Sequence, residues 1–595
     1  MCGIVGYTGP RNATEILMSA LHRLEYRGYD SAGIAVAGSK LQIHKDKGEI
    51  AVMEGTLPSM KGGIGVAHTR WATCGKPSKE NAHPFRDCTG KIALIHNGII
   101  ENFSELKSAL LREGHKFTSE TDTEVLVHLL EKHDKGDLTE AMLATLREVK
   151  GTYALVAVKQ GSDKLVAARK ENPLVIGLGV GENFVASDVT AMLEHTNKVV
   201  YLMDGEIAEI GPRSVRIMDG DGRPIERKSE LVTWSAEDAK KGGFEHFMLK
   251  EIYDEPEAVR NTLIGNLEAD PEWGSAFKDV SSVRMVACGT SYYAAMVGKY
   301  VMEKVAKLPT NVELASEFRY SSAVQENPLV VFISQSGETA DTLAAAREAK
   351  RRGYRTLAIT NVVGSTLSRE VEETLYTRAG PEIGVAATKT FIAQLVMLYL
   401  LSMRMGASRG TIGADELRSI RTQLLGIPKH IRTVLDQSSQ LEEACAMLSE
   451  ARDVFYLGRS VSYPVMLEGA LKLKEISYIH AEGYAAGELK HGPLALIGDK
   501  TPVVAACVRD HTYDKMISNL SEVKARDAPV IAIAQEGDKE IERLADLCLY
   551  VPAVPPFCSP FLVTVLLQLM AYNVAKKRGC PIDKPRNLAK SVTVD

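Results

Sequence analysis

The residue best placed to act as a nucleophile in this sequence is the cysteine that follows the initiator methionine. Met1 precedes a small residue and is normally removed in that setting, which would make Cys2 the N-terminus. The free α-amine, with an ordinary pKa of about 8, could then take the thiol proton directly or through water. Position alone is weak support for catalysis, so the interpretation depends on the polar residues that accompany Cys2.

Several polar residues in the first quarter of the chain would complete an amide-cleaving site around this thiol. Arg70 could bind a carboxylate through two parallel hydrogen bonds, and Asp122 could accept an ammonium group. Asn97 and Gly98 offer a side-chain amide and a backbone N–H as an oxyanion hole. Together these groups suit attack on the side-chain amide of a free amino acid, although each alone could be an ordinary turn or ion-pair residue.

A second group of polar residues, SQSGET at 334–339, is suited to binding phosphate. A β-branched run ends at Ser334, and a helix is expected from Ala340. Backbone N–H groups at a helix N-terminus, together with hydroxyls, form an anion cradle without a basic side chain. CGTS at 288–291 has the same strand–turn–helix setting and could add Ser291. Ordinary N-capping by Ser and Thr is the alternative for either loop alone.

A third group lies on one expected helix. Glu468, Lys472 and Glu475 stand at i, i+4 and i+7, hence on one helix face. Such a stripe is usually exposed to solvent, but apolar residues flank it closely here. His491 follows, just before a Gly-Pro break. A carboxylate beside a lysine and a histidine suits general acid–base chemistry on a sugar.

The elements expected to position the first group are short strands up to about Ile217, bounded by Gly, Asp and Asn turn signals. Helical patterns at Ala13–Leu24 and Asp122–His133 interrupt them, which favours layered sheets with helices outside. GLGVG at 177–181 joins two strand-like runs rather than opening a helix, so it does not indicate a dinucleotide site. The polar stretch Arg223–Gly243 is the best candidate linker.

The second half alternates β-branched strands with long helices and contains a hidden repeat. VRMVACGTSYY resembles VFYLGRSVSYP when Gly289 is aligned with Gly458, an offset of 169. RTLAIT resembles PVIAIA at an offset of 174, and Phe391 matches Phe561 at 170. These anchors predict two copies of one parallel α/β domain. The second copy reads PVVAACVRD where the first has its SQSGET loop, so we expect one phosphate site per chain.

Composition narrows the class of protein. The chain has 595 residues, 45% hydrophobic and 25% charged, which is typical of a globular protein of about four domains. The net charge of −5, the absence of basic runs and 6% aromatic residues argue against a nucleic-acid partner. The apolar stretches Phe391–Met403 and Phe561–Ala575 are shorter than the roughly 20 residues of a membrane span, so both predict buried helices. No secretory signal is evident, and a cytoplasmic protein without a membrane partner is expected.

The nine cysteines form no CxxC pair, and their spacing fits neither a disulfide framework nor a zinc site. Apart from Cys2, we expect them to be buried reduced thiols.

Five segments in the first half resemble a known family: MCGIVGY, LEYRGYDSAG, HTRWAT, NGIIEN and SETDTE. In this order they resemble the class II glutamine amidotransferase domain, an N-terminal-nucleophile fold with αββα layers. The resemblance implies that Cys2 attacks the glutamine amide and that Thr73 helps to bind glutamine. Cys74 stands where this family usually has a histidine after Trp-Ala-Thr, and we expect it to be a bystander thiol.

SQSGET, LKLKEISY, AEGYAAGELKHGP and the ending PRNLAKSVTVD resemble a pair of sugar isomerase (SIS) domains. The whole chain is then similar to the glutamine–fructose-6-phosphate aminotransferases (isomerizing), the glucosamine-6-phosphate synthases. The resemblance implies conversion of L-glutamine and D-fructose 6-phosphate into L-glutamate and D-glucosamine 6-phosphate, the first step of amino sugar biosynthesis. The expected divisions are a glutaminase domain 2–217, a linker 218–245, SIS domains 277–415 and 446–585, and an active-site tail 586–595.

The same resemblance implies roles for individual residues. Trp71 would gate a buried path for ammonia, and His491 would open the sugar ring. Lys590 would form a Schiff base with the ketone, Glu475 would move the proton between C1 and C2, and Lys472 would assist. The sugar phosphate would be bound by Thr290, Ser291, Ser334, Gln335, Ser336, Thr339, Val385 and Ala589.

The resemblance also implies a homodimer in which His491 completes the neighbouring subunit's site. A Schiff-base lysine makes pyridoxal phosphate unnecessary, and we expect neither a cofactor nor a metal. Two alternatives remain at this stage. One is an amidotransferase that acts on another sugar phosphate, and the other is a non-catalytic sugar-phosphate sensor.

Overall fold

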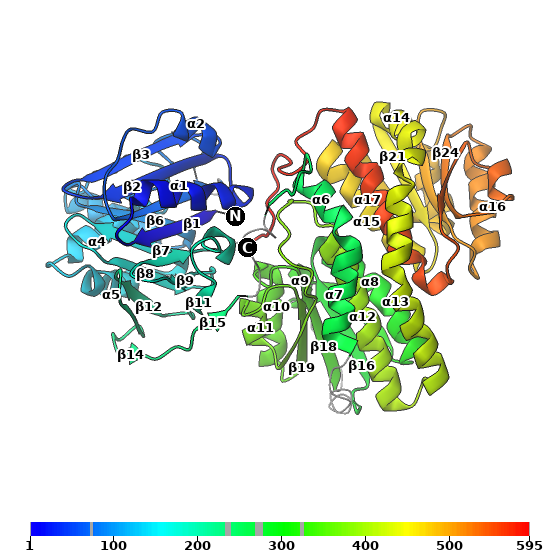
Figure 1. Cartoon of the computed structure of the whole chain (residues 1–595), viewed down its shortest axis with the longest axis horizontal. Coiled ribbons are helices and arrows are strands. Elements are labelled where there is room, and N and C mark those ends of the chain that lie inside the picture. Colours follow the sequence, from blue (N-terminus) through cyan, green and yellow to red (C-terminus); the bar gives the residue numbers. More distant parts are fainter. Residues whose placement is uncertain (1, 72–74, 233–239, 268–277, 322–326, 594–595) are drawn as a thin grey trace. The chain divides into compact units, whose positions relative to one another are not determined.

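The computed structural model describes residues 2–71, 75–232, 240–267, 278–321 and 327–593. They form two compact units (Figure 1). Unit 1 comprises Met1–Lys240 together with Ala589–Asp595, and unit 2 comprises Lys241–Leu588.

Unit 1 contains two antiparallel sheets. The eight-stranded sheet has the order β15 (Glu230–Leu231), β11 (Lys198–Tyr201), β9 (Val175–Leu178), β10 (Asn183–Ala186), β1 (Gly3–Thr8), β4 (Ile64–Arg70), β2 (Ser31–Ala37) and β3 (Leu41–Lys47). The seven-stranded sheet has the order β14 (Pro224–Ile225), β13 (Val215–Met218), β12 (Ile207–Ile210), β8 (Leu165–Lys170), β7 (Gly151–Lys159), β6 (Ile92–Ile100) and β5 (Phe85–Arg86). GLGVG lies in the turn between β9 and β10, as its flanking strands predict.

The two sheets pack face to face around one apolar core, to which Ile4, Val66, Val156 and Ala208 contribute. A second core lies between the seven-stranded sheet and its covering helices. The helices of unit 1 are α1 (Ala13–Arg23), α2 (Ile50–Glu54), α3 (Phe103–Arg112), α4 (Glu124–His133) and α5 (Leu138–Glu148). With α1 on the other sheet, the layers are αββα (Figure 1), which confirms the expected fold of the first half.

Unit 2 contains two five-stranded parallel sheets of matching strand order. The first has the order β17 (Thr310–Leu314), β16 (Ser282–Ala287), β18 (Pro328–Ser334), β19 (Arg355–Thr360) and β20 (Glu373–Tyr376). The second has the order β22 (His480–Ala485), β21 (Asp453–Gly458), β23 (Val503–Cys507), β24 (Val530–Gln535) and β25 (Leu547–Val551). The matching order confirms the repeat that the sequence predicted.

A shared apolar core joins the two repeats of unit 2. The helices are α6 (Phe247–Tyr253), α7 (Glu255–Leu267), α8 (Gly289–Val305), α9 (Ala315–Phe318), α10 (Ala340–Arg351), α11 (Thr366–Glu370), α12 (Lys389–Arg409), α13 (Ala414–Asp436), α14 (Glu442–Glu450), α15 (Ser462–Ser477), α16 (Tyr513–Lys524) and α17 (Ser559–Lys577). By length and composition, α12 and the helical segment Pro556–Lys577 could cross a membrane, but 89% of each apolar window is buried inside the protein. Both are core helices, as predicted.

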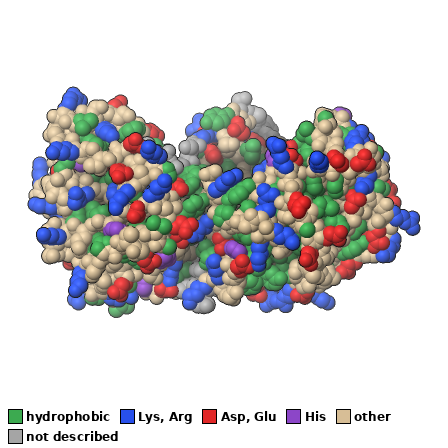
Figure 2. Space-filling view, turned by 90° about the horizontal axis from the view of Figure 1, so that it is seen from above, with side chains coloured by type: hydrophobic (Ala, Val, Ile, Leu, Met, Phe, Trp, Pro, Cys, Tyr) green, Lys and Arg blue, Asp and Glu red, His purple; other side chains and the backbone are tan. Residues whose placement is uncertain are grey.

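The stretch after residue 217 and the cysteines differ in part from what the sequence predicts. The stretch 218–245, expected to be a linker, includes β14 and β15, which pair with strands of the two unit 1 sheets. The expectation that every cysteine but Cys2 is buried is wrong for Cys88, which is exposed. Cys445, Cys507 and Cys558 are buried, whereas Cys288, Cys548 and Cys580 are half-buried. Cys74 lies outside the described residues. On the face shown in Figure 2, acidic and basic side chains are interspersed.

Candidate active sites

The thiol of Cys2 lies beside the end of β4, just before β1 begins. The backbone N–H of Trp71 donates to Cys2 Sγ at 3.3 Å, and Sγ lies 3.5 Å from the carbonyl oxygen of Trp71. These two backbone contacts hold the sulfur at the end of β4. The β1–β4 ladder, which pairs Gly3 with Thr69, sets this contact.

The side chain of Asn97 is fixed in the orientation that an oxyanion hole needs. Asn97 Nδ2 donates to the carbonyl oxygen of Cys2 at 3.0 Å, so Asn97 Oδ1 faces His68 Nε2, also at 3.0 Å. His68 must therefore carry its proton on Nε2. Complete burial lowers the pKa of His68 to about 3, which keeps the ring neutral. The second N–H of the Asn97 amide remains as a donor for a substrate oxygen.

Gly98 follows on β6 and requires the freedom of glycine. Its φ is +133°, and a Cβ at this position would lie 2.1 Å from the carbonyl oxygen of Thr152 on β7. No other residue fits without moving the strand. The sequence thus places a backbone N–H beside the Asn97 amide at the edge of the cavity.

A single cavity brings together most of the predicted glutamine-site residues. Its lining comprises Cys2, Arg70, Trp71, His83, His96, Asn97, Gly98, Thr121, Asp122, Thr123, Asn172, Val592 and Thr593. Arg70 is buried and donates to the carbonyl oxygen of Gly75 at 3.0 Å. Asp122 Oδ2 accepts the N–H of Ile100 at 2.8 Å, which fixes the carboxylate at the cavity. Thr73, also predicted here, lies outside the described residues.

Sequence reasoning missed several residues of this site. His68 begins the HTRWAT motif and His96 directly precedes NGIIEN, so their positions near Arg70 and Asn97 could have identified them. His83 stacks on His68 with ring centroids 4.1 Å apart, and burial keeps the pKa of His83 well below its usual value. Val592 and Thr593 come from the other end of the chain, and no local signal places them here.

The predicted phosphate loop connects β18 to α10. Ser334 Oγ accepts the N–H of Gly337 at 3.1 Å and lies 3.2 Å from the hydroxyl of Thr339. Ser336 Oγ accepts the N–H of Glu338 at 3.1 Å. Thr339 occupies the N-cap position of α10 without making a side-chain capping bond. The hydroxyl of Thr339 therefore does not cap the helix, and it lies instead beside Ser334 in the loop.

Gly337 gives this loop its shape. Its φ is +65°, and an added Cβ would lie 2.2 Å from Ser365 Oγ. Gln335 is held through its backbone, because its carbonyl oxygen accepts the N–H of Asn361 at 3.1 Å. The loop therefore has a fixed curvature over the N-terminus of α10, where backbone N–H groups favour an anion.

The CGTS loop of the first repeat contacts the acid–base helix of the second. Thr290 Oγ1 donates to Glu468 Oε1 at 3.1 Å and accepts from Lys472 Nζ at 3.0 Å. Ser291 Oγ accepts from the side-chain amide of Gln394 on α12 at 3.0 Å. The loop that was predicted to bind phosphate is thus joined to α15 by side-chain hydrogen bonds.

The predicted stripe on α15 is buried rather than exposed. The side chains of Glu468 and Lys472 are each 1% exposed, and Glu475 is 21% exposed. Lys472 Nζ lies 2.7 Å from Glu475 Oε2 and 3.4 Å from Glu468 Oε1. Burial raises the pKa of Glu468 to about 8, with Lys472 opposing the shift. Burial alone would lower the pKa of Lys472, but the neighbouring carboxylates outweigh it and raise that pKa.

This cluster therefore pairs the Lys472 ammonium with Glu475, and burial favours the protonated form of Glu468 beside it. The sequence predicted roles for Lys472 and Glu475 but not for Glu468. The position of Glu468 on the same helix face is the feature from which a role could have been predicted.

The remaining predicted residues lie on other segments of the chain. His491 is exposed at the end of the short helix Ala486–His491. Val385 is buried, and its N–H donates to the carbonyl oxygen of Asp583 at 3.1 Å. Ala589 and Lys590 belong to the segment that groups with unit 1, whereas the phosphate loop belongs to unit 2.

The αββα unit has a cysteine and an Asn-Gly pair in one cavity, and the repeated parallel α/β unit has a hydroxyl-rich loop. Together they define a class: a glutamine amidotransferase joined to paired SIS domains. Family models agree, since a glutamine amidotransferase domain matches residues 68–194 and a SIS domain matches 277–404 and 447–577. The chain belongs to the glutamine–fructose-6-phosphate aminotransferase (isomerizing) family.

The relatives that establish this family membership align with the chain over their whole length. The glutamine–fructose-6-phosphate aminotransferases (isomerizing) of Methanosarcina mazei and Thermus thermophilus are each 50% identical to this chain, with 100% of both chains covered. Among solved structures, the C-terminal domain of glucosamine-fructose-6-phosphate aminotransferase from Francisella tularensis is 41% identical. It matches with a TM-score of 0.56, over 58% of this chain and all of that one.

Proposed function

We propose that this protein converts L-glutamine and D-fructose 6-phosphate into L-glutamate and D-glucosamine 6-phosphate, the first step of amino sugar biosynthesis. The observation that carries the proposal is the arrangement of Cys2, Asn97 and Asp122 around one cavity. It combines a nucleophile, an oxyanion donor and an ammonium acceptor. Full-length identity to aminotransferases of this name supports the acceptor sugar, and no observation favours a different sugar phosphate or a non-catalytic sensor.

In the glutaminase half, removal of Met1 leaves the α-amine of Cys2 as the general base. The thiolate attacks the side-chain carbonyl carbon of glutamine, and the developing oxyanion accepts hydrogen bonds from Asn97 Nδ2 and the N–H of Gly98. Arg70 binds the α-carboxylate, and Asp122 binds the α-ammonium. The amide nitrogen leaves as ammonia, and water then releases glutamate from the thioester. Thr73 contributes to glutamine binding, and Trp71 gates the path that carries ammonia to the sugar.

In the isomerase half, the phosphate of the sugar is bound by hydroxyls and backbone N–H groups rather than by cations. Ser334, Ser336 and Thr339 surround the N-terminus of α10, which favours a dianion. Gln335, Thr290, Ser291, Val385 and Ala589 complete the sugar-binding set.

The remaining steps need an amine, an acid and a base. His491 opens the ring, and Lys590 forms a Schiff base at C2 with loss of water. Ammonia then adds at C2 and displaces the Lys590 amine, so that the nitrogen from glutamine stays on the sugar. Glu475 transfers the proton between C1 and C2, and the buried ammonium of Lys472 stabilises charge that develops on the sugar hydroxyls.

The proposal includes an assembly, a location and a division of the chain. The exposed position of His491 supports a homodimer in which this side chain reaches the partner's sugar site. We place the enzyme in the cytoplasm. The proposed domains are the glutaminase domain 2–217, the linker 218–245, the SIS domains 277–415 and 446–585, and the tail 586–595.

The direct test is incubation of the purified full chain with glutamine and fructose 6-phosphate, with no added cofactor. Glutamate and glucosamine 6-phosphate should appear in equal amounts. Cys2→Ala should abolish the use of glutamine, whereas the matched variant Cys548→Ala should not. A glutamine-analogue electrophile should label Cys2 in a chain that lacks Met1, as mass spectrometry can show. Labelling at Cys74 instead, or an aminated product only from another sugar phosphate, would contradict the proposal.

The Schiff base is tested separately. Borohydride reduction in the presence of fructose 6-phosphate should attach the sugar at Lys590. Lys590→Arg should lose synthesis and retain glutamine hydrolysis. An adduct at Lys472 would show that the assignment of the amine is wrong.

A further inference from the structure

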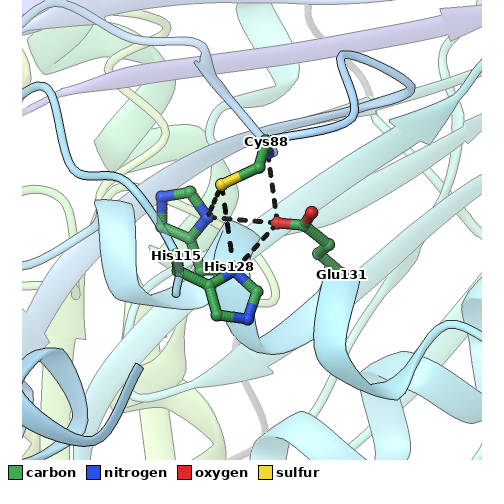
Figure 3. Close-up of side chains that lie close together, drawn as sticks. All are labelled: Cys88, His115, His128 and Glu131. Carbon is green, nitrogen blue, oxygen red and sulfur yellow. Dashed lines mark hydrogen bonds and ion pairs between the residues drawn. The ribbon is translucent and has the colours of Figure 1, made fainter. Parts of the chain in front are cut away.

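Four side chains in unit 1, away from the residues that line the glutamine cavity, place potential metal ligands around one point. They are Cys88, His115, His128 and Glu131, and their ligand atoms all lie within 4.8 Å of one another (Figure 3). Cys88 Sγ lies 3.6 Å from His128 Nδ1 and 3.9 Å from His115 Nδ1. Glu131 Oε2 lies 3.0 Å from His115 Nδ1 and 3.3 Å from His128 Nδ1.

The four separations given above are close to edges of a tetrahedral zinc site, and the remaining two pairs of ligand atoms lie within 4.8 Å of each other. With Zn–S of about 2.3 Å and Zn–N and Zn–O of about 2.1 Å, tetrahedral angles give S···N edges of about 3.6 Å and N···O edges of about 3.4 Å. The four observed distances differ from these edges by a few tenths of an ångström. One thiolate, two imidazoles and one carboxylate are donors that zinc accepts, and sulfur and nitrogen disfavour Ca²⁺ and Mg²⁺.

The surroundings of the four side chains also suit a metal. The N–H of Lys116 donates to Cys88 Sγ at 3.4 Å, which orients the sulfur toward the other three side chains. The His128 side chain is 1% exposed, and its second nitrogen, Nε2, has no hydrogen-bond partner but lies 3.9 Å from Glu124 Oε1. A carboxylate behind a ligating imidazole is the usual second layer of a zinc site. Cys88 is exposed, which leaves a route for the ion to enter.

The four ligands are presented by three local structures. Asp87 closes a turn after β5 by accepting the N–H groups of Lys91 and Ile92 at 2.8 and 2.9 Å, and this turn carries Cys88. His115 lies in the connection between α3 and α4, and the other two ligands lie one helical turn apart on α4. A metal here would join the turn after β5, the α3–α4 connection and α4.

We infer that this chain binds one structural Zn²⁺ through Cys88 Sγ, His115 Nδ1, His128 Nδ1 and Glu131 Oε2. Binding displaces the thiol proton and leaves both imidazoles protonated on Nε2. Four protein ligands leave no open position, so the ion stabilises structure rather than activating water. The connection that it fastens runs on to Asp122, the ammonium acceptor of the proposed glutamine site. The inference does not depend on the proposed reaction.

The test uses the full-length protein, produced in zinc-supplemented medium and purified without chelator. Elemental analysis should find about one zinc per chain. Replacement by Co²⁺ should give the intense visible spectrum of tetrahedral cobalt and a thiolate-to-cobalt charge-transfer band in the near ultraviolet. Cys88→Ser should lose that band and weaken zinc binding by more than about 100-fold in chelator competition. The matched variant Cys580→Ser, at a half-buried cysteine of unit 2, should retain both.

Hydrogen exchange supplies a measurement that does not depend on any variant. Chelation should speed exchange in the α3–α4 connection and in α4, and added zinc should restore protection. The inference is overturned if the wild-type chain neither retains nor takes up zinc, or if Cys88→Ser binds zinc as tightly as wild type. In either case the four side chains form only a hydrogen-bonded cluster centred on Glu131 Oε2.

Discussion

Replacing Gly98 by alanine should damage glutamine hydrolysis far more than it damages folding. The added Cβ would lie 2.1 Å from the carbonyl oxygen of Thr152, whereas real Cβ atoms stay at least 3.0 Å from their neighbours. The strand at residue 98 must therefore retreat by roughly 1 Å, and its N–H moves away from the oxyanion position. Misplacement by about 1 Å can cost about 100-fold in rate, and loss of one oxyanion donor costs about 100- to 1000-fold.

We therefore expect kcat for glutamine hydrolysis to fall by about 100- to 1000-fold, or about 2.7–4 kcal/mol. Gly136→Ala is the matched control. Its φ of +117° is close to that of Gly98, but nothing lies within 4 Å of the added Cβ. Both variants should share the backbone cost of an L-residue at positive φ, about 1–3 kcal/mol. Only Gly98→Ala also carries the clash.

The measurements are glutamate release, urea unfolding followed by circular dichroism, and fructose 6-phosphate binding by calorimetry. Sugar-phosphate binding reports that unit 2 is intact in both variants. The reasoning fails if Gly98→Ala is folded and hydrolyses glutamine within about threefold of Gly136→Ala. It also fails if the control loses as much activity as Gly98→Ala.

Three further predictions concern Glu468 on α15, Ser336 in the phosphate loop and His68 beside Asn97. Burial raises the pKa of Glu468 from 4.5 to about 8, so the folded state keeps a proton that the unfolded state loses. The free energy of unfolding should therefore fall as the pH rises from about 5 towards 8. In urea titrations, Glu468→Gln should make the free energy of unfolding depend less steeply on pH. An unchanged pH dependence would contradict the raised pKa of Glu468. Ser336→Ala should weaken fructose 6-phosphate binding by about tenfold and leave glutaminase activity unchanged, whereas calorimetry that finds two equivalent sites per chain would refute a single phosphate loop. His68→Ala should free the Asn97 amide and lower glutaminase kcat by about tenfold. Because the pKa of His68 is about 3, the pH profile near neutrality should keep its shape, and a shifted profile would show that His68 titrates.

Most of the side chains that gather around the unit 1 cavity could be predicted from sequence, because they lie within short motifs at strand ends. Cys2 precedes β1, Arg70 ends β4, and Asn97 and Gly98 lie on β6. In stacked antiparallel sheets, strand pairing and register bring such strand ends together. The residue types and the order of the motifs along the chain were therefore enough to predict that these side chains lie close together. The position of Val592 could not be predicted, because its contact with the cavity spans nearly the whole chain and leaves no periodic signal.

The repeat in the second half could also be predicted, since hydrophobic strands and apolar helices recur at nearly constant offsets. The side-chain link between the copies could not. Thr290 belongs to one copy, whereas Glu468 and Lys472 belong to the other, and their hydrogen bonds depend on how α8 and α15 pack. The Glu–Lys–Glu spacing predicted that the three side chains share one helix face, but it did not determine whether that face is exposed or buried. Burial against the other repeat decides the protonation of Glu468, and local sequence does not encode that burial.

The Cys88 cluster shows why spacing alone can miss a metal site. Zinc motifs are recognised in sequence when ligands stand a few residues apart on one local structure. Here only His128 and Glu131 do so, on α4, while the other two ligands come from a turn and from a helix connection. Apolar packing of α4 on the seven-stranded sheet brings them together. At its N-terminus α4 is also anchored by Glu124, whose carboxylate accepts the N–H groups of Thr118 and Ser119 at 2.8 and 2.7 Å.

Polar anchors therefore hold the α3–α4 connection along most of its length, from His115 to the start of α4. A loop held only by apolar packing could slide, because such contacts are non-directional. Hydrogen bonds and metal ligands fix position within tenths of an ångström. The connection ends at Asp122, whose carboxylate lines the same cavity as Cys2 and is the proposed ammonium acceptor. On this argument the cluster serves precision at the glutamine site, so its loss should raise KM for glutamine before it lowers kcat.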